Sequence, residues 1–165
     1  MDRLWTPWRL AYVTEAGTVT PGCIFCDALA RGDAEPLIVH RGRAVFVILN
    51  KFPYNNGHLM VVPFRHVGWL ADLTAEELTE FMLLAQRAEA ALAGVYHPQG
   101  FNFGVNLGKA AGAGVLDHLH LHVVPRWSGD TNFMSVVGET RVLPEELPRT
   151  ADRLRAAFKA LVEPA

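Results

Sequence analysis

Residues 118–124 have the sequence HLHLHVV, in which histidine alternates with an apolar residue. Side chains alternate between the two faces of a β-strand, so this pattern predicts a strand. The three histidines then share one face, with neighbouring imidazoles about 6.5–7 Å apart. Leu119, Leu121 and Val123 point the other way, into a core. The chain is therefore expected to contain a sheet with one apolar face and one polar, reactive face.

Three imidazoles on one strand face suit more than one role. Histidine is the side chain whose ordinary pKa lies closest to neutrality, so much of it is neutral and nucleophilic at pH 7. One ring can attack phosphorus while a neighbouring ring donates to the phosphoryl oxygens. The same pattern also fits the exposed polar face of an edge strand, or a metal site made of all three. The spacing by itself leaves these three interpretations open.

A glycine-rich stretch before the histidines favours the first interpretation. Gly108, Gly112 and Gly114 lie in the turn that leads into the predicted strand. Glycines let backbone N–H groups approach an anion closely and form a phosphate nest. Asn106, at the end of the preceding predicted strand, is expected near the same surface, where its amide can hold a phosphate oxygen. Together these features predict a site for a ligand that carries phosphate.

The rest of the pattern predicts an antiparallel α+β domain with one long helix and a C-terminal helix. The long helix is expected over residues 74–94, with a capping box formed by Thr74 and Glu77. The other expected elements are a short helix over 24–31, strands over 37–40, 44–50, 58–62 and 101–107, and a helix over 151–161. A parallel α/β fold would alternate strand and helix throughout, which this chain does not.

Length and composition limit the classes of protein to which this chain can belong. The 165 residues predict one domain over 1–165, with an N-terminal arm over 1–22 and a C-terminal tail over 127–165. The net charge of −2 and the lack of a stretch rich in Lys and Arg argue against a nucleic-acid partner. The first residues do not resemble a signal peptide, and no apolar run reaches bilayer length. The sequence therefore predicts a cytoplasmic protein without a membrane partner.

The two cysteines, Cys23 and Cys26, form a C-x-x-C pair. In a reducing compartment this spacing suggests metal or redox chemistry. The βαβ context of a thioredoxin-like pair is missing, and two buried helix thiols are a further interpretation. Tetrahedral zinc takes four N or S ligands, and C-x-x-C supplies two of them from one short segment.

Residues 118–124 resemble the histidine-triad motif, in which three histidines alternate with apolar residues. Other residues of that pattern follow in the family's order: Cys23-Ile24-Phe25-Cys26, Asn50, Gly57-His58, Pro63 with His66, and residues 106–126. Within the superfamily, three segments look like the diadenosine tetraphosphate phosphorylase branch. They are WTPWR at 5–9, NKFPYNNGH at 50–58 and PRWSGDTNF at 125–133.

The resemblance implies a fold, an assembly and a set of site residues. It implies a homodimer whose sheets join into one, with a nucleotide site in each protomer. By that match His120 is the nucleophile on the α-phosphorus, His122 contacts phosphate oxygens, and His58 supports the catalytic row. The positions expected to hold the nucleotide are Asn50 for the ribose and Asn106, Gly112, Ala113 and Gly114 for the phosphates.

The resemblance also completes a metal site. Zinc-bearing histidine-triad proteins and the related galactose-1-phosphate uridylyltransferases add two histidines to the cysteine pair, which match His66 and His118 here. A structural zinc is therefore expected on Cys23, Cys26, His66 and His118, with no organic cofactor. A closed site of four ligands has no position for water, so the zinc would stabilise the fold and leave His120 free to react.

The implied reaction is nucleotidyl transfer from a dinucleoside polyphosphate to His120 and then to inorganic phosphate. A hydrolase in which water accepts the nucleotide is the close alternative. Two departures leave this choice open: residues 112–114 lack the Gln and Ser or Thr of many hydrolases, and His122 stands where some phosphorylases have Gln. A non-catalytic nucleotide-binding regulatory protein is the alternative from another class, and a metalloenzyme with three histidine ligands is a fourth.

Other aromatic, apolar and histidine residues are not assigned to one role by the sequence. Trp5, Trp8, Phe46 and Ile48 are candidates for an apolar pocket around the base, and each fits a core position equally well. His40 and His97 have no predicted partner and are expected at the surface.

Overall fold

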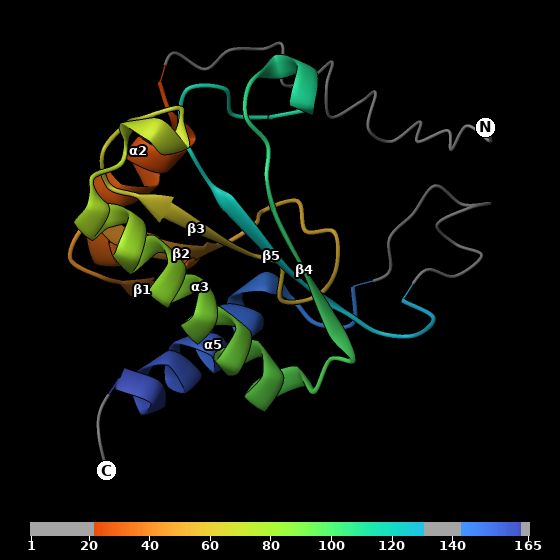
Figure 1. Ribbon diagram of the computed structural model, residues 1–165. Helices are drawn as coiled ribbons and strands as arrows, with labels where there is room; N and C mark the ends of the chain where they lie inside the picture. The colour runs from red at the N-terminus through yellow and green to blue at the C-terminus, as the bar shows by residue number, and fades with distance from the viewer. Residues whose placement is uncertain (1–21, 131–142, 163–165) are drawn as a thin grey trace, which may run out of the picture.

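The computed structural model describes residues 22–130 and 143–162 (Figure 1). Within these ranges the strands form one sheet in the order β1-β2-β3-β5-β4, and every neighbouring pair is antiparallel. The strands are β1 (Ile38–Arg41), β2 (Val45–Leu49), β3 (Leu59–Pro63), β4 (Gly100–Val105) and β5 (Leu121–Arg126). The helices are α2 (Ile24–Ala30), α3 (Ala75–Tyr96) and α5 (Leu147–Val162), with short 3-10 turns η1 (Gly32–Ala34), η2 (Leu70–Asp72) and η3 (Lys109–Ala111). The predicted antiparallel α+β architecture is confirmed.

Part of the sequence analysis concerns residues outside the described ranges. The expected arm over 1–22 lies there except for its last residue, together with Trp5, Trp8 and the WTPWR segment. The end of the segment over 125–133 and the middle of the tail over 127–165 lie there as well.

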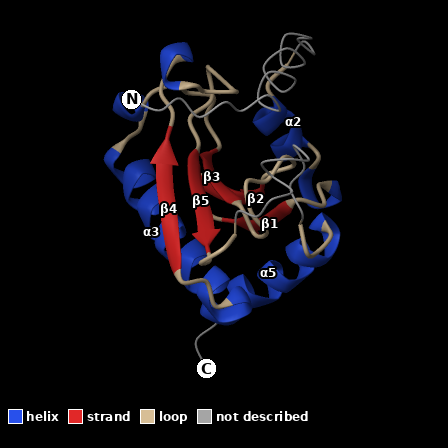
Figure 2. Cartoon of the chain, turned by 90° about the vertical axis from the view of Figure 1, so that its right-hand side faces the viewer, coloured by secondary structure: helices blue, strands red, loops and turns tan. Residues whose placement is uncertain are grey.

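The sheet separates two apolar layers. Helix α3 packs on β2, β3 and β5, while α5 packs on α3 and β1 (Figures 1 and 2). The core on this face includes Leu119, Leu121 and Val123, as their alternation predicts. On the other face, α2 covers a smaller core that contains Phe46 and Ile48. Phe46 has no exposed surface, which favours a packing role over contact with a base.

Strand β5 begins at Leu121, whereas the alternating pattern predicts a start at His118. The register pairs Val61 with Leu121, so continued pairing would bring Leu119 opposite Pro63. Proline has no N–H to donate, and the ladder ends there. The Leu119 N–H donates to the carbonyl of Val67 instead, at 2.6 Å. The first two histidines therefore precede the regular strand.

The other end of β5 extends past residue 124, where the alternating segment ends, to Arg126. Pro125 lies opposite Phe101 of β4, while pairing with β3 ends at Val123. A proline is tolerated where no ladder bond is required of it. Its carbonyl accepts a hydrogen bond from the Asn55 side chain at 3.1 Å.

Helix α5 begins at Leu147, ahead of its expected start at residue 151. Pro148 in its first turn is compatible with a helix start. Glu145, just before the helix, accepts from the Tyr96 hydroxyl at 2.5 Å and from Thr150 at 2.9 Å. These contacts with α3 and within α5 fix the start of the helix, and the sequence pattern does not reveal them.

Helix α3 begins with the predicted capping box. The Thr74 hydroxyl accepts from the Glu77 N–H at 3.2 Å, and the Glu77 carboxylate accepts from the Thr74 N–H at 2.9 Å. Apolar residues at helical spacing form a stripe from Leu78 to Leu92, and two of them, Leu78 and Met82, are 42% and 55% exposed. The stripe is wider than the face that the sheet covers.

We expect Thr74→Ala to lower the free energy of unfolding by about 1 kcal/mol, because the Glu77 N–H loses its acceptor. Urea denaturation measures the change. Thr74→Ser keeps a hydroxyl acceptor and is the matched control. Equal losses in both variants would contradict the capping role.

Candidate active site and metal site

His120 precedes β5 and is 4% exposed. Its Nδ1 lies 2.9 Å from the carbonyl oxygen of His118. A carbonyl only accepts, so Nδ1 carries the proton and Nε2 keeps the lone pair. Burial lowers the pKa of His120, although the bond to the His118 carbonyl favours its protonated form. The ring is therefore neutral at pH 7 and nucleophilic at Nε2.

A chain of hydrogen bonds fixes the tautomers of His58 and His122. The Tyr54 N–H donates to His58 Nδ1 at 3.0 Å, so the His58 proton is on Nε2. His58 Nε2 lies 2.9 Å from His122 Nδ1 and donates to it. The proton of neutral His122 is then on Nε2. This arrangement leaves His120 with a lone pair and His122 with an N–H donor.

The rings of His120 and His122 are closer than expected. Their centroids are 4.9 Å apart, with an interplanar angle of 81°. Each ring makes its own hydrogen bond, His120 to the His118 carbonyl and His122 to His58, and His120 precedes the regular strand. The nucleophilic and donor nitrogens therefore belong to rings in direct contact.

Burial, together with the smaller effect of the adjacent His120, lowers the pKa of His122 from 6.5 to about 4. The unfolded chain thus binds more protons than the folded chain between these pH values. The free energy of unfolding should fall as the pH is lowered from about 6.5 to about 4. We expect His122→Gln to reduce this fall by up to about 1.4 kcal/mol per pH unit.

Urea denaturation of both proteins at several pH values between 7 and 4.5 measures this effect. The groups that face His122 in the wild type, His58, His120 and Tyr54, are present in both proteins, so the comparison isolates the change at residue 122. Parallel pH dependences for the two proteins would show that His122 does not titrate as its burial requires.

The expected nucleotide-binding residues lie around the histidines. Asn50 follows β2, and its Nδ2 lies 3.4 Å from His58 Nδ1. Asn106 is one residue beyond the last pair of the hairpin, Val105 with Leu121, and the register leads from there to His120. Both asparagines are half-buried. Their positions are compatible with contact to a ligand on the histidine row, and their binding roles stay predictions.

The glycine-rich segment turns tightly through η3. Gly108 and Gly112 have φ of 77° and 81°, a region that favours glycine. The N–H groups of Gly112 and Ala113 donate to the carbonyls of Lys109 and Gly108, at 3.0 and 3.5 Å. A phosphate at this turn would therefore compete with internal hydrogen bonds. The phosphate-binding roles of Gly112, Ala113 and Gly114 stay predictions.

The four predicted metal ligands lie together. Their ligand atoms, two cysteine sulfurs and two imidazole nitrogens, are all within 4.8 Å of one another. Cys23 Sγ is 3.1 Å from His118 Nδ1, and Cys26 Sγ is 3.4 Å from His66 Nδ1. The cysteines lie at the start of α2, while His66 follows β3 and His118 precedes β5.

The donor set fits a tetrahedral zinc ion. Two thiolates and two imidazoles are ligands of structural zinc sites. His118 Nε2 lies 2.8 Å from the carbonyl of Pro63 and donates to it, so Nδ1 presents its lone pair to the cysteines. This second hydrogen bond orients the ligand, as is typical of metal-bound histidine.

Two segments that look like the phosphorylase branch contact each other beside the histidines. Asn55 donates to the Pro125 carbonyl at 3.1 Å and to the Asp130 carboxylate at 2.8 Å. Arg126 pairs with Asp130 at 2.6 Å and holds the pKa of that carboxyl far below its ordinary value. These bonds tie the loop before His58 to the end of β5.

Two aromatic residues of the site were not found from the sequence. The Phe25 ring lies 5.4 Å from His118 and 5.1 Å from His120, between centroids. The Tyr54 ring lies 4.7 Å from His58. Both residues stand inside segments quoted for the resemblance, but an aromatic side chain in a motif does not indicate which ring it contacts.

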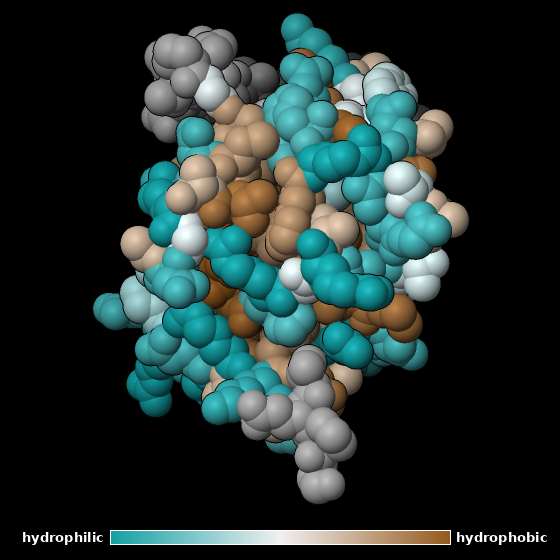
Figure 3. Space-filling model, turned by 90° about the vertical axis from the view of Figure 1, so that its left-hand side faces the viewer, coloured by the Kyte–Doolittle hydropathy of each residue, from teal (hydrophilic) through white to brown (hydrophobic). Residues whose placement is uncertain are grey.

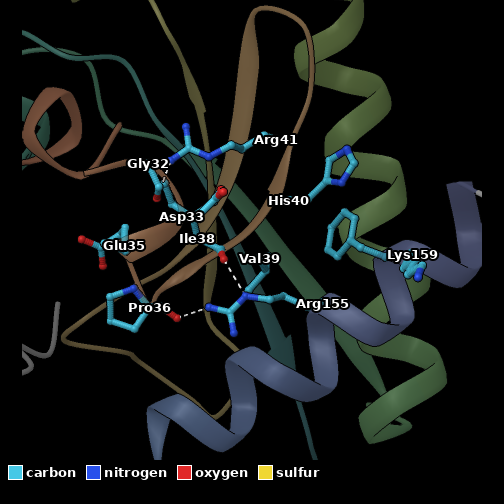
Figure 4. A pocket seen from close by; sticks show the side chains of 12 residues that line it. Gly32, Asp33, Glu35, Pro36, Ile38, Val39, His40, Arg41, Arg155 and Lys159 are labelled. Atoms are coloured by element: carbon cyan, nitrogen blue, oxygen red, sulfur yellow. Dashed lines mark hydrogen bonds between the residues drawn. The ribbon is translucent and has the colours of Figure 1, made fainter. Parts of the chain in front are cut away.

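A hollow of about 750 Å³ lies away from His118, His120 and His122, between η1, β1 and α5 (Figures 3 and 4). Arg155 of α5 donates to the carbonyls of Ile38, at 3.0 Å, and of Pro36, while Arg41 donates to Gly32 at 3.0 Å. These arginines thus bind the backbone beside the outer strand. His40 is half-buried here and stacks on Phe158 at 5.2 Å, which corrects its expected surface position. His97 is exposed, as expected.

Residues 31–129 match the HIT domain family, and the chain belongs to this family. The predicted membership of the histidine-triad superfamily is confirmed. No helix in the described ranges combines the length and apolar character needed to cross a membrane.

Two named relatives and one solved structure are similar to this chain. The chain is 45% identical over 157 residues to AP-4-A phosphorylase of Mycobacterium tuberculosis, covering 91% of this chain and 80% of that protein. It is 38% identical over 121 residues to bis(5'-adenosyl)-triphosphatase of Dictyostelium discoideum, covering 69% and 80%. Its fold matches that of a Zn-bound histidine triad family protein from Mycobacterium smegmatis with a TM-score of 0.68 and 31% identity, over 85% of this chain and 95% of that one.

Proposed function

We propose that this chain is a nucleotidyl transferase that cleaves dinucleoside polyphosphates with inorganic phosphate, through a nucleotidyl–His120 intermediate. The observation that carries the proposal is the hydrogen bond from His120 Nδ1 to the His118 carbonyl, which leaves Nε2 as the nucleophilic nitrogen. The likeness to a mycobacterial AP-4-A phosphorylase supports the choice of substrate class.

In the first step, the lone pair of His120 Nε2 attacks the α-phosphorus. The bond from that phosphorus to the bridging oxygen breaks, and the oxygen leaves with the electron pair as a nucleoside polyphosphate. The Nε2–H of His122 donates to a non-bridging oxygen, and Asn106 supplies a further donor. His58 holds His122 in the tautomer that this role requires.

In the second step, an oxygen of inorganic phosphate attacks the same phosphorus. The bond between phosphorus and His120 Nε2 breaks, and the ring recovers its lone pair. The product is a nucleoside diphosphate. Because the bond to the His118 carbonyl persists, His120 returns to the tautomer in which it started.

We further propose a structural zinc on Cys23, Cys26, His66 and His118. The four converging donors and the Zn-bound relative from Mycobacterium smegmatis support this site. When bound, the ion stabilises the fold and leaves the attack on phosphorus to His120, because four protein ligands leave no open position.

We also propose that two chains pair through β4 and α3. Strand β4 is at the outer edge of the described sheet, where its backbone can pair with a second β4 (Figure 2). The face of the sheet that α3 covers carries four exposed apolar side chains in α3 and β4: Leu78, Met82, Leu83 and Phe103. We expect a dimer in analytical ultracentrifugation and a monomer for Met82→Asp. A monomeric wild type would refute the pairing.

A hydrolase is the second candidate, favoured by the likeness to the bis(5'-adenosyl)-triphosphatase of Dictyostelium discoideum. The two activities share the first step and differ in the acceptor of the nucleotidyl group. A nucleotide-binding regulatory protein would bind the same ligand without forming the adduct.

Product analysis with diadenosine tetraphosphate, with and without inorganic phosphate, tests the proposal. ADP and ATP formed only when phosphate is present establish the phosphorylase. AMP and ATP formed without phosphate assign the hydrolase and keep His120 as nucleophile. Binding without turnover by protein loaded with zinc assigns the regulatory role.

A further inference from the structure

Phe25 is a buried ring that the proposed chemistry does not use. It stands between Cys23 and Cys26 at the start of α2 and is 2% exposed. Its ring contacts both His118, a proposed metal ligand, and His120, the proposed nucleophile. It is therefore in contact with both sites at once.

Among the described residues, contacts of the His120 imidazole include a backbone carbonyl and two rings. The His118 carbonyl accepts from Nδ1, the His122 ring lies 4.9 Å away, and the Phe25 ring lies 5.1 Å away with an interplanar angle of 46°. A single hydrogen bond leaves an imidazole able to tilt about that bond. The Phe25 ring blocks tilting of the imidazole toward one side, and so restricts the direction in which Nε2 points.

The position of Phe25 depends on the cysteines that flank it. Helix α2 has only 7 residues, and its N-cap, Cys23, makes no side-chain capping bond. A helix this short is marginal unless other contacts hold it. A metal ion that binds Cys23, Cys26 and His118 would clamp the start of α2 to the segment that carries His120.

We propose that Phe25 is a positioning residue that couples the metal site to the nucleophile. Metal binding by Cys23 and Cys26 holds the Phe25 ring against His120 and keeps Nε2 aimed at phosphorus. The His118 carbonyl is the second arm of the coupling, because the same residue binds the metal and orients His120. This inference rests on the proposed role of His120.

Phe25→Leu tests the coupling, with Phe81→Leu as its matched control. Phe81 is also buried, at 1% exposed, but belongs to the core on the other face of the sheet. We expect Phe25→Leu to slow formation of the nucleotidyl–His120 adduct in a single turnover by about tenfold, since small misplacements of a reacting group are costly. Substrate affinity and metal content should match those of Phe81→Leu, which should keep the wild-type rate.

Metal removal can be combined with Phe25→Leu in a double-perturbation cycle, which compares the effect of a chelator in the wild type and in the variant. A chelator should slow adduct formation in the wild type, and should slow it much less in Phe25→Leu if the ring transmits the effect. If the chelator slows adduct formation by the same factor in both proteins, Phe25 is not the coupling residue. A rate for Phe25→Leu equal to that of Phe81→Leu would refute it as well.

A spectroscopic measurement is independent of turnover. The His120 Nδ1–H proton, held by the His118 carbonyl, should give a protected NMR signal in the metal-loaded wild type. The protection should fall on metal removal and in Phe25→Leu, and persist in Phe81→Leu. If the wild type forms no adduct, the proposed function fails. The NMR comparison then shows separately whether Phe25 orients the ring, and unchanged protection refutes that orientation.

Discussion

Replacing His120 by alanine is expected to lower turnover of diadenosine tetraphosphate by about 10⁴-fold or more, since the covalent route loses its nucleophile. Neither neighbour can substitute. The lone pair of His122 Nδ1 is used by the bond from His58, and His118 Nδ1 faces the cysteines. Intact-protein mass spectrometry after a single turnover should show the nucleotidyl adduct in the wild type and none in His120→Ala.

His97→Asn is the control for this variant. His97 is exposed at the end of α3 in the left-handed region, with φ of 48°, which asparagine tolerates. We expect unchanged turnover. Near-normal turnover by His120→Ala, or an adduct on another residue, would exclude the proposed mechanism.

Replacing Cys26 by serine is expected to release the metal and lower the melting temperature by about 10 °C, from a loss of about 4 kcal/mol of stabilisation by a tightly bound ion. The hydroxyl is a poor substitute for a thiolate ligand, and the remaining three ligands no longer close the site. Elemental analysis and differential scanning calorimetry measure the two effects. The loss of metal should destabilise the segment over 22–30 first, because its first turn carries both cysteines.

His120→Ala separates this metal site from one built on all three histidines. In the wild type, His120 Nδ1 donates to the His118 carbonyl and is not a metal ligand. We therefore expect His120→Ala to retain the metal in full. Loss of metal from His120→Ala together with retention by Cys26→Ser would assign the ion to the histidine row instead. That result would also exclude coupling through the cysteines.

The three histidines of one short segment thus contact two different groups of side chains. His118 is 1% exposed and contacts Cys23, whereas His122 contacts His58. His120 lies between them and touches both neighbours, through the His118 carbonyl and the His122 ring. Under the proposed function, five consecutive residues would therefore hold a metal ion and present the nucleophile.

Several features follow from the sequence alone because they depend on local periodicity. The alternation over 118–124 predicted which side chains enter the core, and Leu119, Leu121 and Val123 do so. The Thr74 and Glu77 spacing predicted the start of α3. The resemblance named Cys23, Cys26, His66 and His118 as one group, and their ligand atoms do lie together.

Other features depend on contacts between segments distant in sequence, and only the tertiary structure decides them. Pro63 of β3 ends the pairing of β5, so the first two histidines leave the regular strand. Tyr54 fixes the tautomer of His58 through a backbone N–H, which no side-chain pattern encodes. The ring of Phe25 meets His120 because α2 folds over the far face of the sheet. Periodicity specifies the face on which a side chain lies, whereas the protonated nitrogen and its partner depend on the atoms that packing brings within hydrogen-bonding distance.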